Sequence, residues 1–261
     1  MPAVAVIALF EKTGQLVLAA CEDVGRFWTM LGQALYWSVR PPFDVREWVR
    51  QMVRVGFDSI LVVGLTAAFT GAVLALQTYT VLDRFNAGNW VGSVVALSLT
   101  RELAPVLTAL MIAGRIASSL AAELGSMRVT EQIDALTTMA TQPVQYLVVP
   151  RVAAGTLMLP PLVLLADLLG IFGGYGVAVY LLGANPNTYW ERTYQFLQVN
   201  DVMSGLIKAA VFGLILSVTG CAKGYYTEGG AEGVGRSTTA AVVMSSLVIL
   251  LSDFFLTKLL F

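Results

Sequence analysis

The sequence predicts an all-α, polytopic membrane protein with five transmembrane helices, an N-terminal interfacial helix and a short helix on the cytoplasmic side. Of its 261 residues, 57% are apolar and only 13% are charged, and the mean hydropathy is +0.74. A soluble domain is about 45–50% apolar and about 25% charged. The chain therefore lacks the charge that a water-facing surface needs, which excludes an ordinary soluble enzyme and a disordered linker.

The net charge and the counts of histidine and cysteine exclude further classes of protein. Sixteen basic and 17 acidic residues give a net charge of −1, so no basic excess is present for nucleic-acid phosphates. Histidine is absent, which excludes imidazole-based zinc sites and His-based acid–base catalysis. Cys21 and Cys221 lie far apart in apolar surroundings and are expected to be free thiols. We expect no catalytic residue, metal or cofactor.

Residues 1–52 mix apolar and polar positions at helical spacing. Trp28 lies with the apolar residues, whereas Glu22, Asp23 and Arg26 lie on the other face. Such a stretch is typical of a helix in the membrane interface, and a soluble amphipathic helix packed on a partner is the alternative. The consecutive prolines 41–42 end it, so residues 1–52 form an interfacial helix and an elbow.

Residues 53–261 contain the predicted transmembrane domain. The run 59–82 has no charge and, at about 1.5 Å per residue, is long enough to cross a hydrocarbon core of about 30 Å. Four further apolar stretches follow between polar turns, and no internal repeat is visible. The five expected spans are 59–82, 90–124, 152–182, 202–222 and 238–261.

Basic residues predict the orientation, because Lys and Arg are enriched in cytoplasmic loops. With the N-terminus in the cytoplasm, ten basic residues lie on the inner side and three on the outer side. The C-terminus is then periplasmic. The inner ten are Lys12, Arg26, Arg40, Arg46, Arg50, Arg54, Arg128, Arg151, Lys223 and Arg236, and the outer three are Arg84, Arg192 and Lys258.

Ionisable residues inside the spans are costly unless they are paired or wetted. Asp253 follows Arg236 by 17 residues, so it lies about 25 Å further outward. The same arithmetic places four residues of three spans in the outer half of the bilayer. They either line an outward-facing cavity or form structural ion pairs, and the spacing favours neither. The four are Arg101, Glu102, Lys208 and Asp253. Arg115 and Glu123 lie deeper toward the inside, where structural pairing is expected.

No motif for an energy source is present: GxxxxGK[ST], GxGxxG, GxSxG and HExxH are all absent. Any uphill movement therefore needs a partner or an ion gradient. The segment 123–143 predicts how a partner binds. Gly125 and Ser126 are expected to interrupt the second span, and a helix of about four turns follows at about 127–142, before Pro143. A short cytoplasmic helix between two spans resembles the coupling helix of an ABC transporter permease.

Four motifs carry a more specific resemblance. LALQTY (74–79), LSLTRELAPVLTALMIAGR (97–115), AAELGSMRVTEQIDAL (121–136) and SDFFLTKLLF (252–261) resemble the MlaE permease family, which serves phospholipid transport between bacterial membranes. The resemblance extends from about Arg40 to Phe261, and no motif matches in the first 35 residues.

The resemblance implies a transport subunit in the inner membrane, which forms a homodimer and leaves ATP hydrolysis to a partner. A cytoplasmic ABC ATPase would bind the coupling helix, a periplasmic MCE-domain lipid-binding protein would sit on the outer face, and a small cytoplasmic accessory subunit is a further expected partner. The phospholipid would occupy an outward-open pocket at the dimer interface. Its lining would be Leu76, Tyr79, Arg101, Glu102, Lys208 and Asp253, and the ATPase-coupling residues would be Glu131, Gln132, Asp134, Leu136 and Met139.

Two other functions compete with this one. A secondary transporter would use Glu102, Asp167 or Asp253 as a proton site, but inverted repeats are expected there. A membrane scaffold would have no transport of its own. Copurification of an ATPase subunit separates the ATP-driven permease from the secondary transporter.

Overall fold

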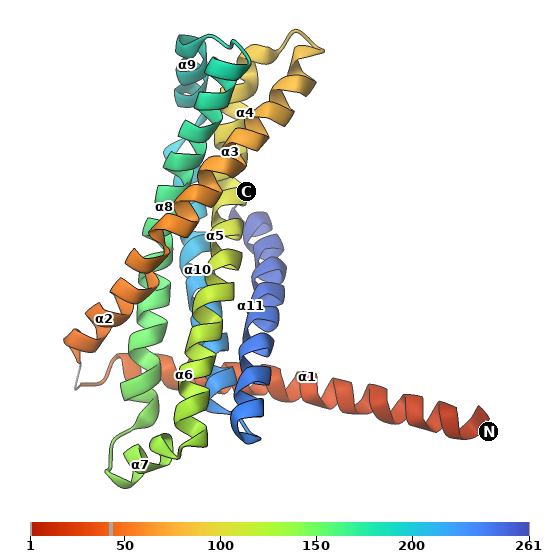
Figure 1. The fold of residues 1–261 in the computed structure, drawn as a ribbon, viewed down its shortest axis with the longest axis vertical. Helices are drawn as coiled ribbons and strands as arrows, with labels where there is room; N and C mark the ends of the chain where they lie inside the picture. Colours follow the sequence, from red (N-terminus) through yellow and green to blue (C-terminus); the bar gives the residue numbers. More distant parts are fainter. Residues whose placement is uncertain (1, 42–43, 261) are drawn as a thin grey trace.

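Five long apolar helical spans form the body of the protein (Figure 1). The computed structural model describes residues 2–41 and 44–260, and for residues 2–20 little more than the backbone. Within these ranges every regular element is helical. The prediction of an all-α polytopic membrane protein is confirmed. The spans are Val45–Asp83, Gly88–Val129, Val144–Leu181, Val199–Tyr225 and Gly230–Leu260.

The first span consists of α2 (Val45–Val55), the short 3₁₀ turn η1 (Phe57–Ser59) and α3 (Ile60–Asp83). Asp44 begins it as an N-cap, because its carboxylate accepts a hydrogen bond from the Glu47 backbone N–H. The span therefore begins well before the uncharged run 59–82 that predicted it.

The second span is a single long helical path with two π-helical turns. It begins with the 3₁₀ turn η2 (Gly88–Trp90) and ends in α6. The expected interruption at Gly125 and Ser126 is wrong, because α6 continues to Val129. Gly125 is instead a packing position, where a Cβ would lie 3.0 Å from Thr227 Oγ1. The remaining segments are α4 (Val91–Ser98), η3 (Leu99–Leu103), α5 (Ala104–Ile112), η4 (Ala113–Ala117) and α6 (Ser118–Val129).

The short helix that follows, α7, spans only Gln132–Thr138. The expected helix of about four turns over 127–142 is therefore wrong in length. Glu131 and Ala140 explain the difference, because both adopt left-handed backbone conformations, with φ of 58° and 57°. Such residues break a right-handed helix on either side of α7.

The third span joins the π-helical turn η5 (Val144–Val148), α8 (Val149–Gly176) and η6 (Val177–Leu181). The helix α9 (Pro186–Phe196) lies at the end of the bundle opposite α7 (Figure 1). Asn185 caps α9 through its side-chain oxygen. The fourth and fifth spans are α10 (Val199–Tyr225) and α11 (Gly230–Leu260).

The α10 helix lies at the centre of the bundle. Its apolar segment is the most buried of the five spans, and that of α11 is the least buried. Glycines allow its close contacts. A Cβ at Gly213 would lie 2.3 Å from Gly155 O of α8, and one at Gly205 would lie 2.4 Å from Thr100 O of η3. Small residues in spans bring helix backbones together in this way.

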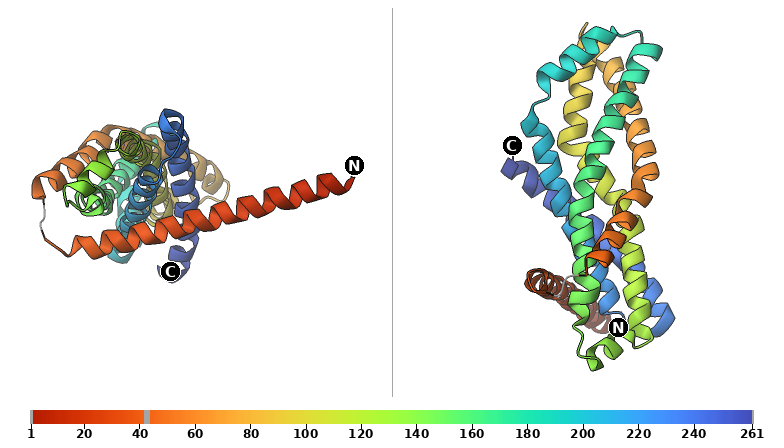
Figure 2. Two further views of the ribbon diagram at one scale, coloured as in Figure 1. Left: turned by 90° about the horizontal axis from the view of Figure 1, so that it is seen from below. Right: turned by 90° about the vertical axis from the view of Figure 1, so that its left-hand side faces the viewer.

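The N-terminal helix α1 (Pro2–Ser38) crosses the bundle at the end where α7 lies (Figures 1 and 2). Its C-terminal half is anchored. Met30 and Ala34, four residues apart on one face, are buried in the main core, and Asp23 forms an ion pair with Lys223 of α10 at 2.5 Å. The direction of α1 agrees with an interfacial helix, and its place in a membrane stays a prediction.

Candidate functional site

A buried ammonium joins three spans in one half of the bundle. Lys208 of α10 is completely buried, and its Nζ lies 2.8 Å from Glu102 Oε2 of η3 and 3.0 Å from Asp253 Oδ1 of α11. It also donates to Thr257 Oγ1 at 2.7 Å. The sequence left open which carboxylate pairs with Lys208, and the structure pairs it with both. We call Glu102, Lys208, Asp253 and Thr257 the charged cluster.

The backbone of η3 takes part in the charged cluster for a reason visible in the sequence. Pro105 has no N–H with which to close the α-helical hydrogen bond to the carbonyl of Arg101. Lys208 Nζ donates to that carbonyl at 3.0 Å instead. The π-helical turn and the proline thus supply a neutral acceptor, and the ammonium has four oxygen neighbours.

The charged cluster is buried on one side and open on the other. Glu102 is 38% exposed and Asp253 is 20% exposed. Both carboxylates line a cavity of about 370 Å³, whose other residues are Leu250, Phe254, Thr257 and Lys258. Two carboxylates and the ammonium of Lys258 therefore line the cavity together with apolar side chains, and the buried Lys208 lies behind the carboxylates.

Arg101 is turned away from the charged cluster, toward the start of α10. Its Nε and Nη2 lie 2.8 Å and 2.7 Å from Asp201 Oδ1. Asp201 is buried, and its other oxygen accepts from the Gln198 backbone N–H. Asp201 is not among the residues predicted from the sequence. The sequence spacing that could have indicated it is that of a capping box, which Gln198 and Asp201 form at the N-terminus of α10.

Leu76 and Tyr79 do not meet the charged cluster within a single chain. Leu76 is exposed on α3, whereas Tyr79 packs in a second core cluster and lies beside Gly88. A separate apolar groove of about 690 Å³ runs along α3 and reaches Leu103, the neighbour of Glu102. Neither Leu76 nor Tyr79 lines this groove or the cavity at Glu102 and Asp253.

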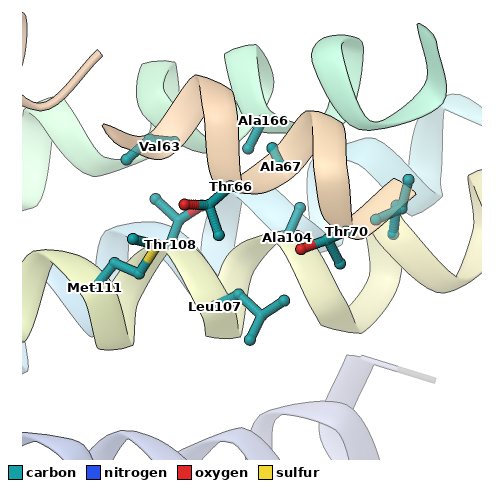
Figure 3. A pocket seen from close by; sticks show the side chains of 10 residues that line it. Val63, Thr66, Ala67, Thr70, Ala104, Leu107, Thr108, Met111 and Ala166 are labelled. Atoms are coloured by element: carbon teal, nitrogen blue, oxygen red, sulfur yellow. The ribbon is translucent and has the colours of Figure 1, made fainter. Parts of the chain in front are cut away.

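The groove along α3 continues into a narrow cleft between α3 and α5 (Figure 3). Thr66 and Thr70 belong to both, and in the close-up their side chains extend from α3 toward α5. Thr108 and Met111 approach from α5, and Ala166 of α8 lies behind them. The cleft itself is too small for a ligand, at about 10 Å³, so the usable space is the groove.

The predicted coupling residues lie at the other end of the bundle, on and beside α7. Glu131, Gln132 and Asp134 are exposed, and Met139 is 75% exposed. Leu136 is half-buried against the core and, with the buried Ile133, anchors α7. Asp134 pairs with Arg128 at 2.7 Å, a contact that the spacing did not predict. The exposed side chains are available to a partner.

Of the other ionisable groups inside the spans, Arg115 and Glu123 form ion pairs or hydrogen bonds with neighbouring helices, and Asp167 is buried without such a partner among the described residues. Glu123 forms ion pairs with Arg54 and with Arg151, the latter at 3.2 Å, and Arg115 donates to Ser59 Oγ at 2.7 Å. Arg115 and Glu123 thus both take part in structural contacts, but with other residues and not with each other. Asp167 of α8 differs, because it is buried and neither carboxylate oxygen has a hydrogen-bond partner among the described residues.

Outside the spans, one titratable group is perturbed. Burial raises the pKa of the Tyr189 hydroxyl above its usual range, and this group donates to Ile171 O at 3.2 Å. This hydrogen bond holds α9 against α8. In the described part of the chain, no group of three or more Cys, Asp or Glu side chains is arranged to hold a metal ion.

Comparison with known proteins decides the family. Residues 48–259 match the sequence model of the family described as Permease MlaE. The chain belongs to the MlaE permease family. The resemblance seen in the four sequence motifs is confirmed, and the match includes the charged cluster, α7 and all but a few terminal residues of the five spans.

Relatives of this MlaE-family permease extend over nearly its whole length. A probable ABC transporter permease protein of Rickettsia bellii is 48% identical over 251 residues, which cover 96% of this chain and 97% of the relative. The intermembrane phospholipid transport system permease protein MlaE of Haemophilus influenzae is 37% identical over 259 residues, which cover 98% of each. The chloroplastic protein TRIGALACTOSYLDIACYLGLYCEROL 1 of Arabidopsis thaliana is 38% identical over 88% of this chain and 66% of its own length.

Proposed function

We propose that this chain is the permease subunit of an ATP-driven ABC transporter that moves phospholipids between the inner and outer membranes. The match to the MlaE permease family over residues 48–259 carries the proposal. The printed function of the Haemophilus influenzae relative, intermembrane phospholipid transport, supports the substrate class. The protein is then a multi-pass protein of the inner membrane, with its N-terminus in the cytoplasm and its C-terminus in the periplasm.

The phospholipid binds in an outward-open pocket between two copies of the chain. A phospholipid needs an apolar wall for its acyl chains and polar partners for its headgroup. The groove along α3 offers the first, and the cavity lined by Glu102 and Asp253 offers the second. In one chain the two are separate spaces, which the neighbouring residues Leu103 and Glu102 of η3 line. A homodimer would bring the groove of one copy to the cavity of the other and so complete the pocket.

The lipid-binding proposal is tested by lipid phosphorus bound per purified complex. Glu102→Gln keeps the shape of the side chain but removes a charge from the cavity, so we expect less bound lipid and slower transport. Glu191→Gln, on the exposed surface of α9 and outside the lining of the cavity, is the matched control for the amount of bound lipid. Unchanged lipid content and transport in Glu102→Gln would refute the pocket.

The ATPase binds α7, and a periplasmic MCE-domain protein binds the opposite end of the bundle, with a small accessory subunit as a further partner. Glu131, Gln132, Asp134 and Met139 are exposed, which suits a contact surface. Glu131→Lys places a mismatched charge there, and such changes in an interface cost binding energy. We expect less copurified ATPase while the permease is still inserted, and Glu191→Lys serves as the control. Equal ATPase recovery from both variants would contradict the assignment.

One observation favours a second candidate function, proton-coupled transport. Asp167 is buried in a span and has no hydrogen-bond partner among the described residues, as expected for a proton-carrying carboxyl. Asp167→Asn separates the candidates. A proton-coupled transporter loses transport in this variant, whereas an ATP-driven permease keeps ATP-dependent transport.

A further inference from the structure

A groove of about 420 Å³ lies between α1, α10 and α11, at the end of the bundle where α1 crosses. Its charged end is distant from the charged cluster, because Lys208 precedes Lys223 by 15 residues, or about 22 Å along α10. Its apolar end reaches Leu251, two residues before Asp253 of the charged cluster. One part of its lining is charged and the other is apolar. The charged residues are Asp23, Arg26, Lys223 and Arg236, and the apolar ones include Phe27, Trp28, Met244, Val248 and Leu251.

The charged part of the groove attracts anions. Three of the four charged residues are cations, so the lining carries a net charge of +2 when Asp23 is counted. Lys223 pairs with Asp23 at 2.5 Å, and Arg26 pairs at 2.5 Å with Glu22, which does not line the groove. Arg236 forms no ion pair with any residue that the structure describes. A planar guanidinium of this kind suits a phosphate.

The apolar part of the groove extends into the depth of the membrane. Val248 and Leu251 follow Arg236 by 12 and 15 residues on the unbroken helix α11, which places them about 18 and 22 Å further along it. Leu251 and Trp28 are exposed side chains. A soluble anion would use only the charged end. A lipid with its phosphate beside Arg236 would also cover the apolar wall.

We propose that this groove binds an anionic glycerophospholipid from the leaflet on the α1 side. The phosphate contacts Arg236, Arg26 and Lys223, and an acyl chain lies along Val248 and Leu251. An anionic headgroup is favoured over a zwitterionic one because of the net charge of +2. The bound lipid holds α1 against α10 and α11. In the orientation given under Proposed function this leaflet is cytoplasmic, and the binding itself does not depend on that orientation or on transport.

The test uses Trp28 as a reporter in nanodiscs that contain the purified full-length permease. Quenching is measured with phosphatidylglycerol or phosphatidylcholine brominated on the acyl chains, at equal mole fraction. Subtracting the signal of Trp28→Phe isolates the contribution of Trp28 from those of the other four tryptophans. We expect stronger quenching by the anionic lipid. Arg236→Gln should lower this preference about fivefold, the effect of one surface cation.

Arg46→Gln is the matched control, because Arg46 is an exposed cation on α2 outside the groove. It should leave the lipid preference unchanged. Equal quenching by both lipids would overturn the proposal, as would an equal loss in both variants, which would report only general surface charge. Loss of the preference in inorganic phosphate would show a site for soluble anions instead. A Trp28 that neither lipid reaches would show that a second copy of the chain covers the groove.

Discussion

Removing the ammonium of Lys208 should destabilise the permease strongly. Lys208→Met keeps the length of the side chain but leaves Glu102 and Asp253 facing each other without the cation that lay 2.8 and 3.0 Å away. Removing one partner of a buried ion pair costs about 3–5 kcal/mol. Because Glu102 and Asp253 are 38% and 20% exposed, water solvates part of the remaining charge. We therefore expect the lower end, about 3 kcal/mol.

The same reasoning predicts a rescue. In Lys208→Met combined with Glu102→Gln and Asp253→Asn, no unpaired charge remains, so stability should return to within about 1 kcal/mol of the original protein. Stability is measured by denaturant unfolding in one detergent. Lys258→Met, an exposed cation on the same end of α11, should change it by less than about 0.5 kcal/mol. A triple variant no more stable than Lys208→Met alone would refute the ion-pair account.

Four further single substitutions test the packing, the ion pair of Arg101 and the proposed ATPase contact. Arg101→Ala should cost about 1–3 kcal/mol, because it removes the partner of the buried Asp201, and adding Asp201→Asn should recover part of this loss in the same unfolding assay. Gly71→Ala should destabilise by about 1–3 kcal/mol, since its Cβ would lie 1.9 Å from Gly170 O. Gly114→Ala, with nothing within 4 Å of its Cβ, should stabilise its helix by up to about 1 kcal/mol. Met139→Asp should leave stability unchanged, because the side chain is 75% exposed, but should lower the amount of copurified ATPase; full ATPase recovery would speak against α7 as the contact.

Depth along a helix could be read from the sequence, but direction around it could not. Residue counting placed Arg101, Glu102, Lys208 and Asp253 at similar depths, and three of them do meet. The fourth, Arg101, points to Asp201 instead. Neighbouring residues on a helix point about 100° apart. Whether residue 101 or residue 102 faces α11 therefore depends on the rotation of the second span about its own axis, which is set by packing against the neighbouring helices.

The helix ends near α7 were predicted less well for a related reason. Apolar spacing alone allowed a helix over 127–142, and Gly125 was taken as a break. Gly125 instead packs against Thr227, in the turn between α10 and α11, a contact between residues about a hundred positions apart in the chain. The actual stop is Glu131, a residue with no special tendency to adopt a left-handed backbone. Local sequence patterns do not reveal such tertiary choices.

The close glycine contacts of the spans determine which helices can move independently. Gly213 of α10 abuts the backbone of α8, and Gly71 of α3 does the same from the other side. Sliding these helices past one another would drive backbone atoms together, so α3, α8 and α10 behave as one stiff block. Beyond Ile249 the described residues of α11 are exposed or half-exposed, and this part of the helix is held to the block by polar contacts of Asp253 and Thr257 with Lys208. Moving α11 against the block would therefore require these polar contacts to break, and it would open and close the cavity at Glu102 and Asp253.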